Sequence, residues 1–432
     1  MSEEQPAGSP DDGPTPRAGQ ARRGRRRARP PRRHTVARVL VVTGLALAMV
    51  TALATVWLYR DLNGNLTVTD VTGQLTDRPD EVDVEGPQEP VNILVMGSDD
   101  RDGEGNNIDG LTGDGQRSDT TILFHLSADR EHAYGVSIPR DSLVTRPDCT
   151  GPDGENIPGA EDAMWNEAFA VGGPACTIQQ FEQTTDVRIN HYVVVDFAGF
   201  KDMVDAIDGV PVCIPEDISD PAHGINIEAG SREIRGDEAL NYVRARYTLG
   251  DGSDIGRVKR QQAFIAGMAN KVVSGGVLAR PDRLVGFLRA ATKSLTVDPG
   301  MGNVVKLSKV GLGFQDIGLD NIRFITVPFE YDSREEFRGR IVWTEQAETV
   351  WQRIRNDQTI SKRLDSGLLT AGNVPGSPRS TPDGGDEDES ESPSASESES
   401  ESESGGPESP GASTAPRDES QTAALEAAGL CT

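Results

Sequence analysis

The feature that most constrains this chain is an apolar segment, Val39 to Tyr59, that contains no charged residue. About 21 helical residues rising 1.5 Å each span roughly 30 Å, the thickness of the hydrocarbon core of a bilayer. An arginine-rich stretch, Arg22 to Arg33, precedes the segment, and arginines before a span keep that side in the cytoplasm. We therefore expect residues 1–38 to be a basic, disordered cytoplasmic arm and residues 39–59 a single transmembrane helix, with everything after Arg60 outside the membrane.

Two other interpretations fit this N-terminal region less well. A basic arm can bind nucleic acid, but this arm runs directly into the span, so we expect no nucleic-acid partner. Ala52, Leu53 and Ala54 offer the A-x-A pattern of a signal-peptide cleavage site. Because the apolar run continues past that site to Trp57 and Tyr59, an uncleaved anchor in the cytoplasmic membrane is the favoured interpretation.

The remainder of the chain divides by composition. The formal net charge of −26 comes in large part from residues 372–432, where the run DEDESESPSASESESESES repels itself and is unsuited to forming a core. We expect this tail to be disordered, residues 60–89 to be a polar linker, and residues 331–371 to be a helical extension. One sizeable domain is then left, over residues 90–330.

The pattern within residues 90–330 predicts an α/β fold. Continuous apolar runs at 91–98 and 191–197 are typical of buried strands. They alternate with amphipathic segments such as 254–273, which indicate helices, and two further helices are expected over Ala160–Val171 and Ala175–Thr185. We predict an α/β/α sandwich around a mixed central sheet.

The cysteines suggest one disulfide bond. Cys149 and Cys176 flank a loop rich in Gly and Pro, and outside the cytoplasm a bridge closing that loop would stabilise the fold by roughly 3 kcal/mol. Cys213 lies in the apolar run VPVCIP and is expected to be a small buried residue, whereas Cys431 in the tail is expected to be free. The spacings of the cysteines and histidines match no zinc template, so surface or core roles are expected for the histidines.

The helix predicted over 254–273 carries charged residues on its apolar stripe. At about 100° per residue, the stripe contains Arg257, Arg260, Gln261, Phe264, Ile265 and Met268. The opposite, solvated side is expected to carry Lys259, Gln262 and Asn270. Because an unpaired buried cation is expensive, the inward arginines must meet anions. Those anions are either carboxylates of the same fold or a bound phosphate, whose oxygens suit the arginine fork.

Eight blocks of sequence give the chain a family resemblance. They are NILVMGSDDR, QRSDTTILFHLS, SIPRDS, NEAFAVGGP, INHYVVVDFAGF, VDAIDGVPVCIP, RGDEALNYVRAR and DIGRVKRQQAFI. In order and approximate spacing the chain resembles the LytR-CpsA-Psr family of bacterial envelope proteins over residues 90–330. The resemblance implies an extracytoplasmic α/β/α domain that transfers an anionic glycopolymer from a polyprenyl pyrophosphate carrier to peptidoglycan and releases polyprenyl phosphate.

The resemblance also implies roles for individual residues. Asp99 and Asp119 would bind Mg²⁺, for which Mn²⁺ is an alternative, and Asp100 is the alternative to Asp99. The residues around the pyrophosphate would be Arg101, Arg117, Arg140, Arg244, Arg246, Arg257, Arg260 and Gln261. The catalytic group would be Asp99, Asp119, Arg117 and Arg140, with Asp99 or Asp119 also accepting the hydroxyl proton. Phe264, Ile265 and Met268 would line a lipid pocket or pack in the core.

Three functions remain open from the sequence. A transferase would pass the glycopolymer to a sugar hydroxyl of peptidoglycan. A pyrophosphatase would use the same metal and arginines but let water attack. A non-catalytic envelope scaffold would bind polymer through its charged surface and keep the arginines as ion pairs.

Overall fold

The computed structural model describes residues 33–84, 86–98, 118–220, 225–245, 254–274, 276–278, 280–361, 369–374, 425–426 and 428–431. Helix α1 (Arg33–Asn65) contains the apolar segment, and residues 35–57 are all exposed. In the described part of the chain it is the one helix long and apolar enough to cross a bilayer. An N-terminal helix of this kind fits a single-pass membrane anchor.

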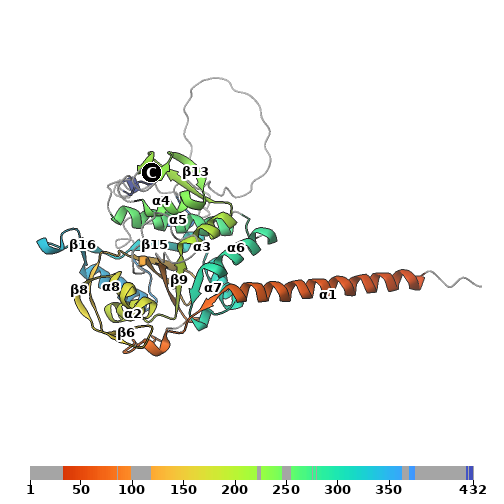
Figure 1. The fold of residues 1–432 in the computed structure, drawn as a ribbon, viewed down its shortest axis with the longest axis horizontal. Helices are drawn as coiled ribbons and strands as arrows, with labels where there is room; N and C mark the ends of the chain where they lie inside the picture. The colour runs from red at the N-terminus through yellow and green to blue at the C-terminus, as the bar shows by residue number, and fades with distance from the viewer. Residues whose placement is uncertain are drawn as a thin grey trace, which may run out of the picture. The chain divides into compact units, whose positions relative to one another are not determined.

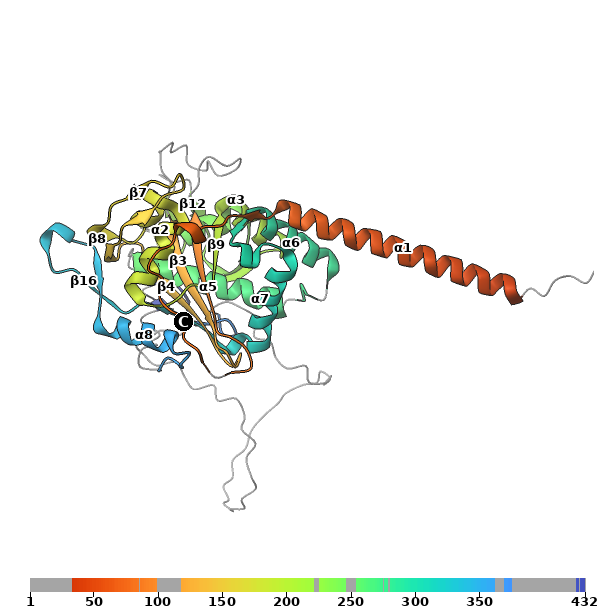
Figure 2. The same ribbon diagram turned by 90° about the horizontal axis from the view of Figure 1, so that it is seen from below.

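An eight-stranded mixed sheet forms the centre of the domain. Its strands, in spatial order, are β1 (Thr67–Val68), β14 (Leu295–Val297), β9 (His191–Asp196), β2 (Val91–Ser98), β3 (Ser118–Leu126), β4 (Ala133–Ile138), β15 (Ile322–Thr326) and β18 (Leu369–Thr370). Strand β2 is parallel to β9 and antiparallel to β3, and β4 is antiparallel to β3 and parallel to β15. Figure 2 shows β3 and β4 side by side at the centre of the domain.

Helices cover both faces of this sheet. On one face, α2 (Glu167–Thr185) and α8 (Glu345–Arg355) pack their aromatic residues Phe181 and Trp351 against Leu94 and Leu123 of the strands. On the other face, α5 (Asp254–Ser274) and α7 (Val304–Ile317) cover a second apolar cluster. Figure 1 shows α5 and α2 on opposite sides of the sheet. The predicted α/β/α sandwich around a mixed sheet is confirmed.

The other elements are short or lie outside this sandwich. The outer helices are α3 (Phe197–Ala206), α4 (Gly236–Arg244) and α6 (Pro281–Ser294). The small strands are β5 (Leu143–Arg146), β6 (Cys149–Thr150), β7 (Asn156–Ile157), β8 (Ala160–Met164), β10 (Val210–Ile214), β11 (Ile218–Asp220), β12 (Ile225–Ile227), β13 (Gly230–Ile234), β16 (Phe329–Tyr331) and β17 (Ile341–Trp343). Single 3₁₀ turns occur at Thr72–Gln74, Pro299–Met301, Leu319–Asn321 and Glu335–Phe337.

The central helix α5 is buried on more than one side, which the helical pattern did not predict. Its Phe264 packs into an outer cluster built from α3, α4, β10 and β13, while Ala263 and Ala266 face the sheet. Gln262 was expected on a solvated face, but it is 2% exposed and donates to Ser137 Oγ and the Ile325 carbonyl. That expectation is wrong because a second layer covers the helix.

The helix predicted over Ala160–Val171 is also wrong in its first half. Residues Ala160–Met164 form β8, which pairs antiparallel with β5, so the gain from strand pairing outweighs local helix preference. Helix α2 begins at Glu167 and continues through a kink at Gly172 and Gly173, where Gly173 has φ +63°. The second predicted helix, Ala175–Thr185, is the part of α2 beyond this kink.

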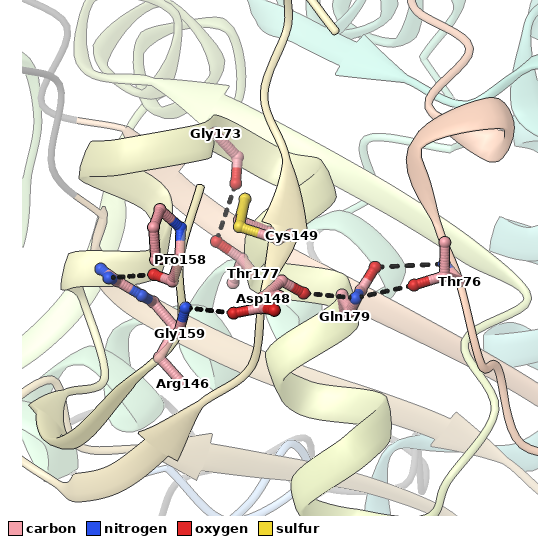
Figure 3. The surroundings of a disulfide bond; sticks show 10 residues. Thr76, Arg146, Asp148, Cys149, Pro158, Gly159, Gly173, Thr177 and Gln179 are labelled. Atoms are coloured by element: carbon pink, nitrogen blue, oxygen red, sulfur yellow. Dashed lines mark hydrogen bonds between the residues drawn. A yellow bond between two sulfur atoms is a disulfide. The ribbon is translucent and has the colours of Figure 1, made fainter. Parts of the chain in front are cut away.

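Cys149 and Cys176 form a disulfide in the structure, with their Cα atoms 5.4 Å apart. It joins the hairpin of β6 and β7 to α2. Figure 3 shows how Gln179 holds the same region: its side chain donates to the Asp148 carbonyl at 2.7 Å and accepts from the backbone N–H of Thr76 at 3.1 Å. The loop is therefore fixed to α2 by a covalent bond and by hydrogen bonds.

The expectations for the other two cysteines are wrong. Cys213 of β10 and Cys431 form a disulfide across a sequence separation of 218 residues. Leu425, Ala428 and Leu430 are buried beside α5. The last described residues, 425–426 and 428–431, are therefore docked on the domain through their own apolar side chains. The Ser/Glu-rich segment of the expected disordered tail lies outside the described residues.

Candidate active site

A pocket opens between the sheet and helices α3, α4 and α5, with about 990 Å³ of empty space including its mouth. Its wall is largely apolar and includes Val95, Ile122, Phe124, Phe200, Phe264, Ile265 and Met268. Its polar lining residues are Asp119, Thr120, Asp196, Arg244, Arg257 and Gln261. The structure thus brings Asp119, Arg244, Arg257 and Gln261 together with the three residues predicted for a lipid pocket.

A β-bulge directs Asp119 into this pocket. Gly97 pairs in register with Thr120 and Ser98 with Ser118, so Asp119 is the extra residue of the bulge. Thr120 and Ile122 line the pocket from one face of β3, and regular alternation would turn Asp119 to the opposite face. A bulge re-aims a side chain in this way and is common beside functional sites.

Arg140, two residues beyond the end of β4, reaches Asp119 from the neighbouring strand. Its Nη1 donates to Asp119 Oδ1 at 2.6 Å, and its Nε lies 3.4 Å from Asp254 Oδ1 and 3.7 Å from Asp141 Oδ2. Burial disfavours the charge of the guanidinium, yet the carboxylates of Asp119 and Asp254 hold the pKa of Arg140 above its usual value. Arg140 is therefore a permanent cation in contact with three carboxylates.

Arg257 lies in the first turn of α5 and is 2% exposed. Its Nη2 lies 2.7 Å from Asp254 Oδ1, one helical turn earlier, so Arg140 and Arg257 share this carboxylate. Both oxygens of Asp254 are buried. Asp254 and Asp141 were not predicted as site residues, although each stands beside a predicted arginine in the sequence, at i−3 from Arg257 and i+1 from Arg140.

Arg244 and Gln261 occupy the α4 side of the pocket. Arg244 is the last residue of α4, and its guanidinium carbon lies 4.9 Å from the centre of the Phe197 ring. Gln261 donates from Nε2 to the Val243 carbonyl at 3.2 Å, which ties α5 to the end of α4. These contacts position a cation and an amide at the pocket lining.

Arg260 does not line the pocket, although the helical stripe placed it with Arg257. It is 0% exposed and donates from Nη1 to the Ala428 carbonyl at 2.9 Å and from Nη2 to the Ala245 carbonyl. Arg260 therefore binds the end of α4 and the docked C-terminal segment. Of the two arginines, Arg257 is the one at the pocket.

Four of the predicted site residues lie outside the described residues, together with the alternative metal ligand Asp100. They are Asp99, Arg101, Arg117 and Arg246. The described part of the site therefore contains Asp119, Arg140, Arg244, Arg257 and Gln261.

The described residues fit a magnesium ion at Asp119 better than at Asp254. Mg²⁺ takes hard oxygen ligands and needs only one or two carboxylates when phosphate oxygens and waters complete its shell. The Asp119 side chain is 24% exposed and lines the pocket, so a metal and its waters can reach it. Asp254 is instead enclosed between two guanidinium groups.

Comparison with known proteins gives a consistent family assignment. A model of the LytR_cpsA_psr family matches residues 58–358. The chain is 34% identical over 271 residues to the "Probable cell wall biosynthesis protein LcpB" of Corynebacterium glutamicum, covering 61% of each protein. It is 30% identical over 260 residues to "Cell wall biosynthesis protein LcpA" of the same organism, covering 55% of this chain and 49% of that one. The chain thus spans about half to three fifths of these relatives.

The fold has a counterpart among solved structures. A crystal structure of a protein from Streptococcus agalactiae superimposes with a TM-score of 0.51 at 24% sequence identity. The match covers 63% of this chain and 90% of that one. At this identity the likeness concerns the fold.

Proposed function

The chain belongs to the LytR_cpsA_psr family, and from this membership and the pocket we propose that it is a magnesium-dependent phosphotransferase of the cell envelope. It moves an anionic glycopolymer from a polyprenyl pyrophosphate carrier to a sugar hydroxyl of peptidoglycan and releases polyprenyl phosphate. The relatives named as cell wall biosynthesis proteins support a role in the cell envelope, and helix α1 supports a single-pass membrane anchor. The arginines before the span favour a cytoplasmic N-terminus and an extracytoplasmic catalytic domain.

The proposal rests on one observation: the pocket has a cationic part and an apolar part. Arg244 and Arg257 provide cations at a pocket whose remaining wall includes Phe264, Ile265 and Met268. A ligand that matches both parts has an anionic head and a long apolar chain, as a polyprenyl pyrophosphate does. Arginine forks bind phosphate oxygens in pairs, and apolar burial adds about 25 cal/mol per Å² of covered chain.

In the proposed reaction, the acceptor hydroxyl oxygen forms a bond to the phosphorus next to the glycopolymer. The bond from that phosphorus to the bridging oxygen breaks, and polyprenyl phosphate leaves with the electron pair. Asp119 accepts the hydroxyl proton in this scheme. Arg140 and Arg257 stabilise the charge that develops on the phosphate oxygens, the electrostatic contribution on which phosphoryl transfer mostly depends.

Asp119 is the described residue that would hold the metal, with Asp99 as the expected second carboxylate. A bound Mg²⁺ would neutralise part of the pyrophosphate charge and orient it. Arg140 keeps Asp119 in place through its 2.6 Å hydrogen bond. Because Arg140 also contacts Asp141 and Asp254, it can shift toward an incoming phosphate without losing every carboxylate contact.

One observation favours the scaffold alternative. The sequence pattern allowed the inward arginines to be structural ion pairs, and Asp254 does contact both Arg140 and Arg257. A fold that neutralises these arginines internally has less need of a phosphate. The transferase must therefore be tested against a protein that binds polymer without turning it over.

The test is release of polyprenyl phosphate by the full-length protein in detergent. The assay would contain a polyprenyl-pyrophosphate-linked glycan, with and without peptidoglycan, in Mg²⁺ or in EDTA. We expect release that requires both peptidoglycan and Mg²⁺, and its loss in Asp119→Asn. As a matched control, Asp282→Asn alters an exposed carboxylate paired with Arg280 and should keep full activity.

Each alternative gives a different result. Release without peptidoglycan would identify a pyrophosphatase. Binding of the glycan without release under any of these conditions would identify a scaffold. Equal release by wild type and Asp119→Asn would remove Asp119 from the mechanism.

A further inference from the structure

A second polar cluster lies at the far end of β3 from the pocket. His125 is near the end of this strand, six residues or roughly 20 Å beyond Asp119. His132 immediately precedes β4, and Asp357 follows α8. One ring nitrogen from each histidine and one carboxylate oxygen lie within 4.8 Å of one another. The cluster is distinct from the proposed transferase site and does not depend on it.

The proton on His125 can be assigned from its neighbours. Nδ1 lies 2.8 Å from Asn92 Oδ1, while Asn92 Nδ2 donates to the Arg188 carbonyl at 2.9 Å. That second hydrogen bond fixes the amide, because a flipped Asn92 would point its oxygen at a carbonyl. His125 therefore donates from Nδ1, and Nε2 of its neutral form carries a lone pair.

This lone pair faces another acceptor. His125 Nε2 lies 3.0 Å from Asp357 Oδ1, and the other oxygen of that carboxylate accepts from the Ala128 backbone N–H at 3.0 Å. His125 is 0% exposed, so water does not separate the two atoms. Two acceptors at this distance, on side chains that are 1% and 10% exposed, require a proton or a metal cation between them.

His132 decides between these two possibilities. Its Nδ1 lies 3.9 Å from Asp129 Oδ1, and Asp129 is itself held by Ser127 Oγ at 2.6 Å and by the Glu131 N–H at 2.8 Å. Its Nε2 is buried and has no hydrogen-bond partner among the described residues. A proton on His125 would leave this nitrogen unsatisfied, whereas a cation can accept electron pairs from all three groups.

The surroundings of His125 match those of metal-binding histidines. Such histidines orient their second ring nitrogen toward a carboxylate or carbonyl oxygen, which leaves the first nitrogen as the ligand. Here Nδ1 of His125 lies at hydrogen-bond distance from Asn92 Oδ1, whereas Nδ1 of His132 lies 3.9 Å from Asp129 Oδ1, too far for a hydrogen bond. Two imidazoles and one carboxylate are a ligand set that Zn²⁺ accepts, with water in the fourth position.

We propose that His125, His132 and Asp357 bind one Zn²⁺ ion. The ion joins the connection between β3 and β4 to the end of α8, segments more than 200 residues apart in sequence. Its role is structural: it fixes the ends of the central strands β3 and β4 that lie away from the pocket. The sequence spacing did not reveal the site, because the third ligand comes from a distant segment.

The experiment uses the full-length protein in detergent, stripped with EDTA and dialysed. Zinc content after incubation with ZnCl₂ would be measured by mass spectrometry, and the melting temperature would be recorded with and without Zn²⁺. We expect one zinc ion per chain and a rise in melting temperature for the wild type. His132→Gln should lower the zinc affinity by more than about 10-fold while keeping the melting temperature measured in EDTA.

His191→Gln is the matched control, because His191 also contacts a carboxylate, Asp298, at 3.1 Å. It should bind zinc as the wild type does. The proposal is overturned if the wild type takes up no zinc and melts at the same temperature with and without it. Unchanged zinc binding by His132→Gln would overturn it equally.

Discussion

Strand β3 carries polar groups at both ends, and the cost of burying them is offset in different ways. At its start, Asp119, Arg140 and Arg257 form a network with Asp254 in which opposite charges meet. At its end, His125 and Asp357 face each other as acceptors. The first end is neutralised by the fold itself, whereas the second requires a proton or a cation.

The pocket arginines already have carboxylate partners, whereas the acceptors of the histidine cluster face each other. Under the proposed function, a pyrophosphate entering the pocket would compete with Asp119 and Asp254 for the same guanidinium groups, so its binding would exchange one set of ion pairs for another. At the histidine cluster, His132 Nε2 has no hydrogen-bond partner among the described residues, and His125 Nε2 and Asp357 Oδ1 face each other as acceptors. A cation would provide these lone pairs with a shared partner. The pocket suits turnover, and the cluster suits permanent binding.

The largest effect on stability is expected for Asp254→Asn. The substitution leaves Arg257, which is 2% exposed, without this carboxylate, and breaking a buried ion pair costs about 3–5 kcal/mol. The free energy of unfolding would be measured in urea. Asp282→Asn, which changes an exposed pair with Arg280, is the control and should leave stability unchanged. If Asp254→Asn is as stable as wild type, the fold does not neutralise the pocket arginines. The contrast between the two ends of β3 would then be wrong.

The next largest effect is expected on activity, for Arg244→Ala. This arginine contacts the Phe197 ring and lines the pocket. Loss of that cation–π contact by itself should cost about 0.5–1 kcal/mol of stability. Loss of one electrostatic stabiliser of a transition state lowers the rate by about 10²–10³-fold. Polyprenyl phosphate release by Arg244→Ala and by the exposed-site variant Arg280→Ala would be compared. A large loss of stability with full activity per folded molecule would assign Arg244 to structure alone.

Much of the fold could be predicted because local pattern and tertiary environment agree. Residues 91–98 form a strand with those bounds, and the helix predicted over 254–273 is α5, Asp254–Ser274. Prediction failed where distant segments decide the local structure. Ala160–Met164 becomes a strand because β5 pairs with it, and Gln262 is buried because an outer layer covers α5.

The candidate site was also predicted only in part, and again the failures involve distant segments. The apolar stripe correctly placed Arg257, Gln261 and Phe264 on one pocket, because helical periodicity alone brings them together. The stripe did not separate Arg257 from Arg260, since the carbonyl of Ala428 that binds Arg260 belongs to a segment 168 residues away. The disulfide of Cys213 with Cys431 was missed for the same reason, as no pattern near either cysteine indicates the other.

A smaller effect is expected when this C-terminal tether is removed. The double variant Cys213→Ser and Cys431→Ser releases a segment closed over a separation of 218 residues, and loss of a disulfide costs about 2–4 kcal/mol. Unfolding in urea without reductant would measure it. Because the tether reaches Arg260 rather than the pocket lining, polyprenyl phosphate release per folded molecule should be unchanged. A loss of release at full folding would show that the tail shapes the pocket.

The smallest effect on stability is expected for Asp357→Asn. This variant is also the sharpest test of the histidine cluster at the end of β3. An asparagine can accept from the Ala128 N–H through its oxygen and donate from its amide to the lone pair on His125 Nε2, so no buried acceptor is left facing another. In EDTA we expect the free energy of unfolding to change by less than about 1 kcal/mol.

With ZnCl₂ present, Asp357→Asn should be clearly less stable than the wild type, because an amide oxygen is a much weaker zinc ligand than a carboxylate. The wild type should gain stability on adding zinc, and the variant should gain little. No response of the wild type to zinc would show that a proton rather than a metal ion lies between His125 and Asp357. Both ends of β3 would then be ion-pair networks, and the difference between them would disappear.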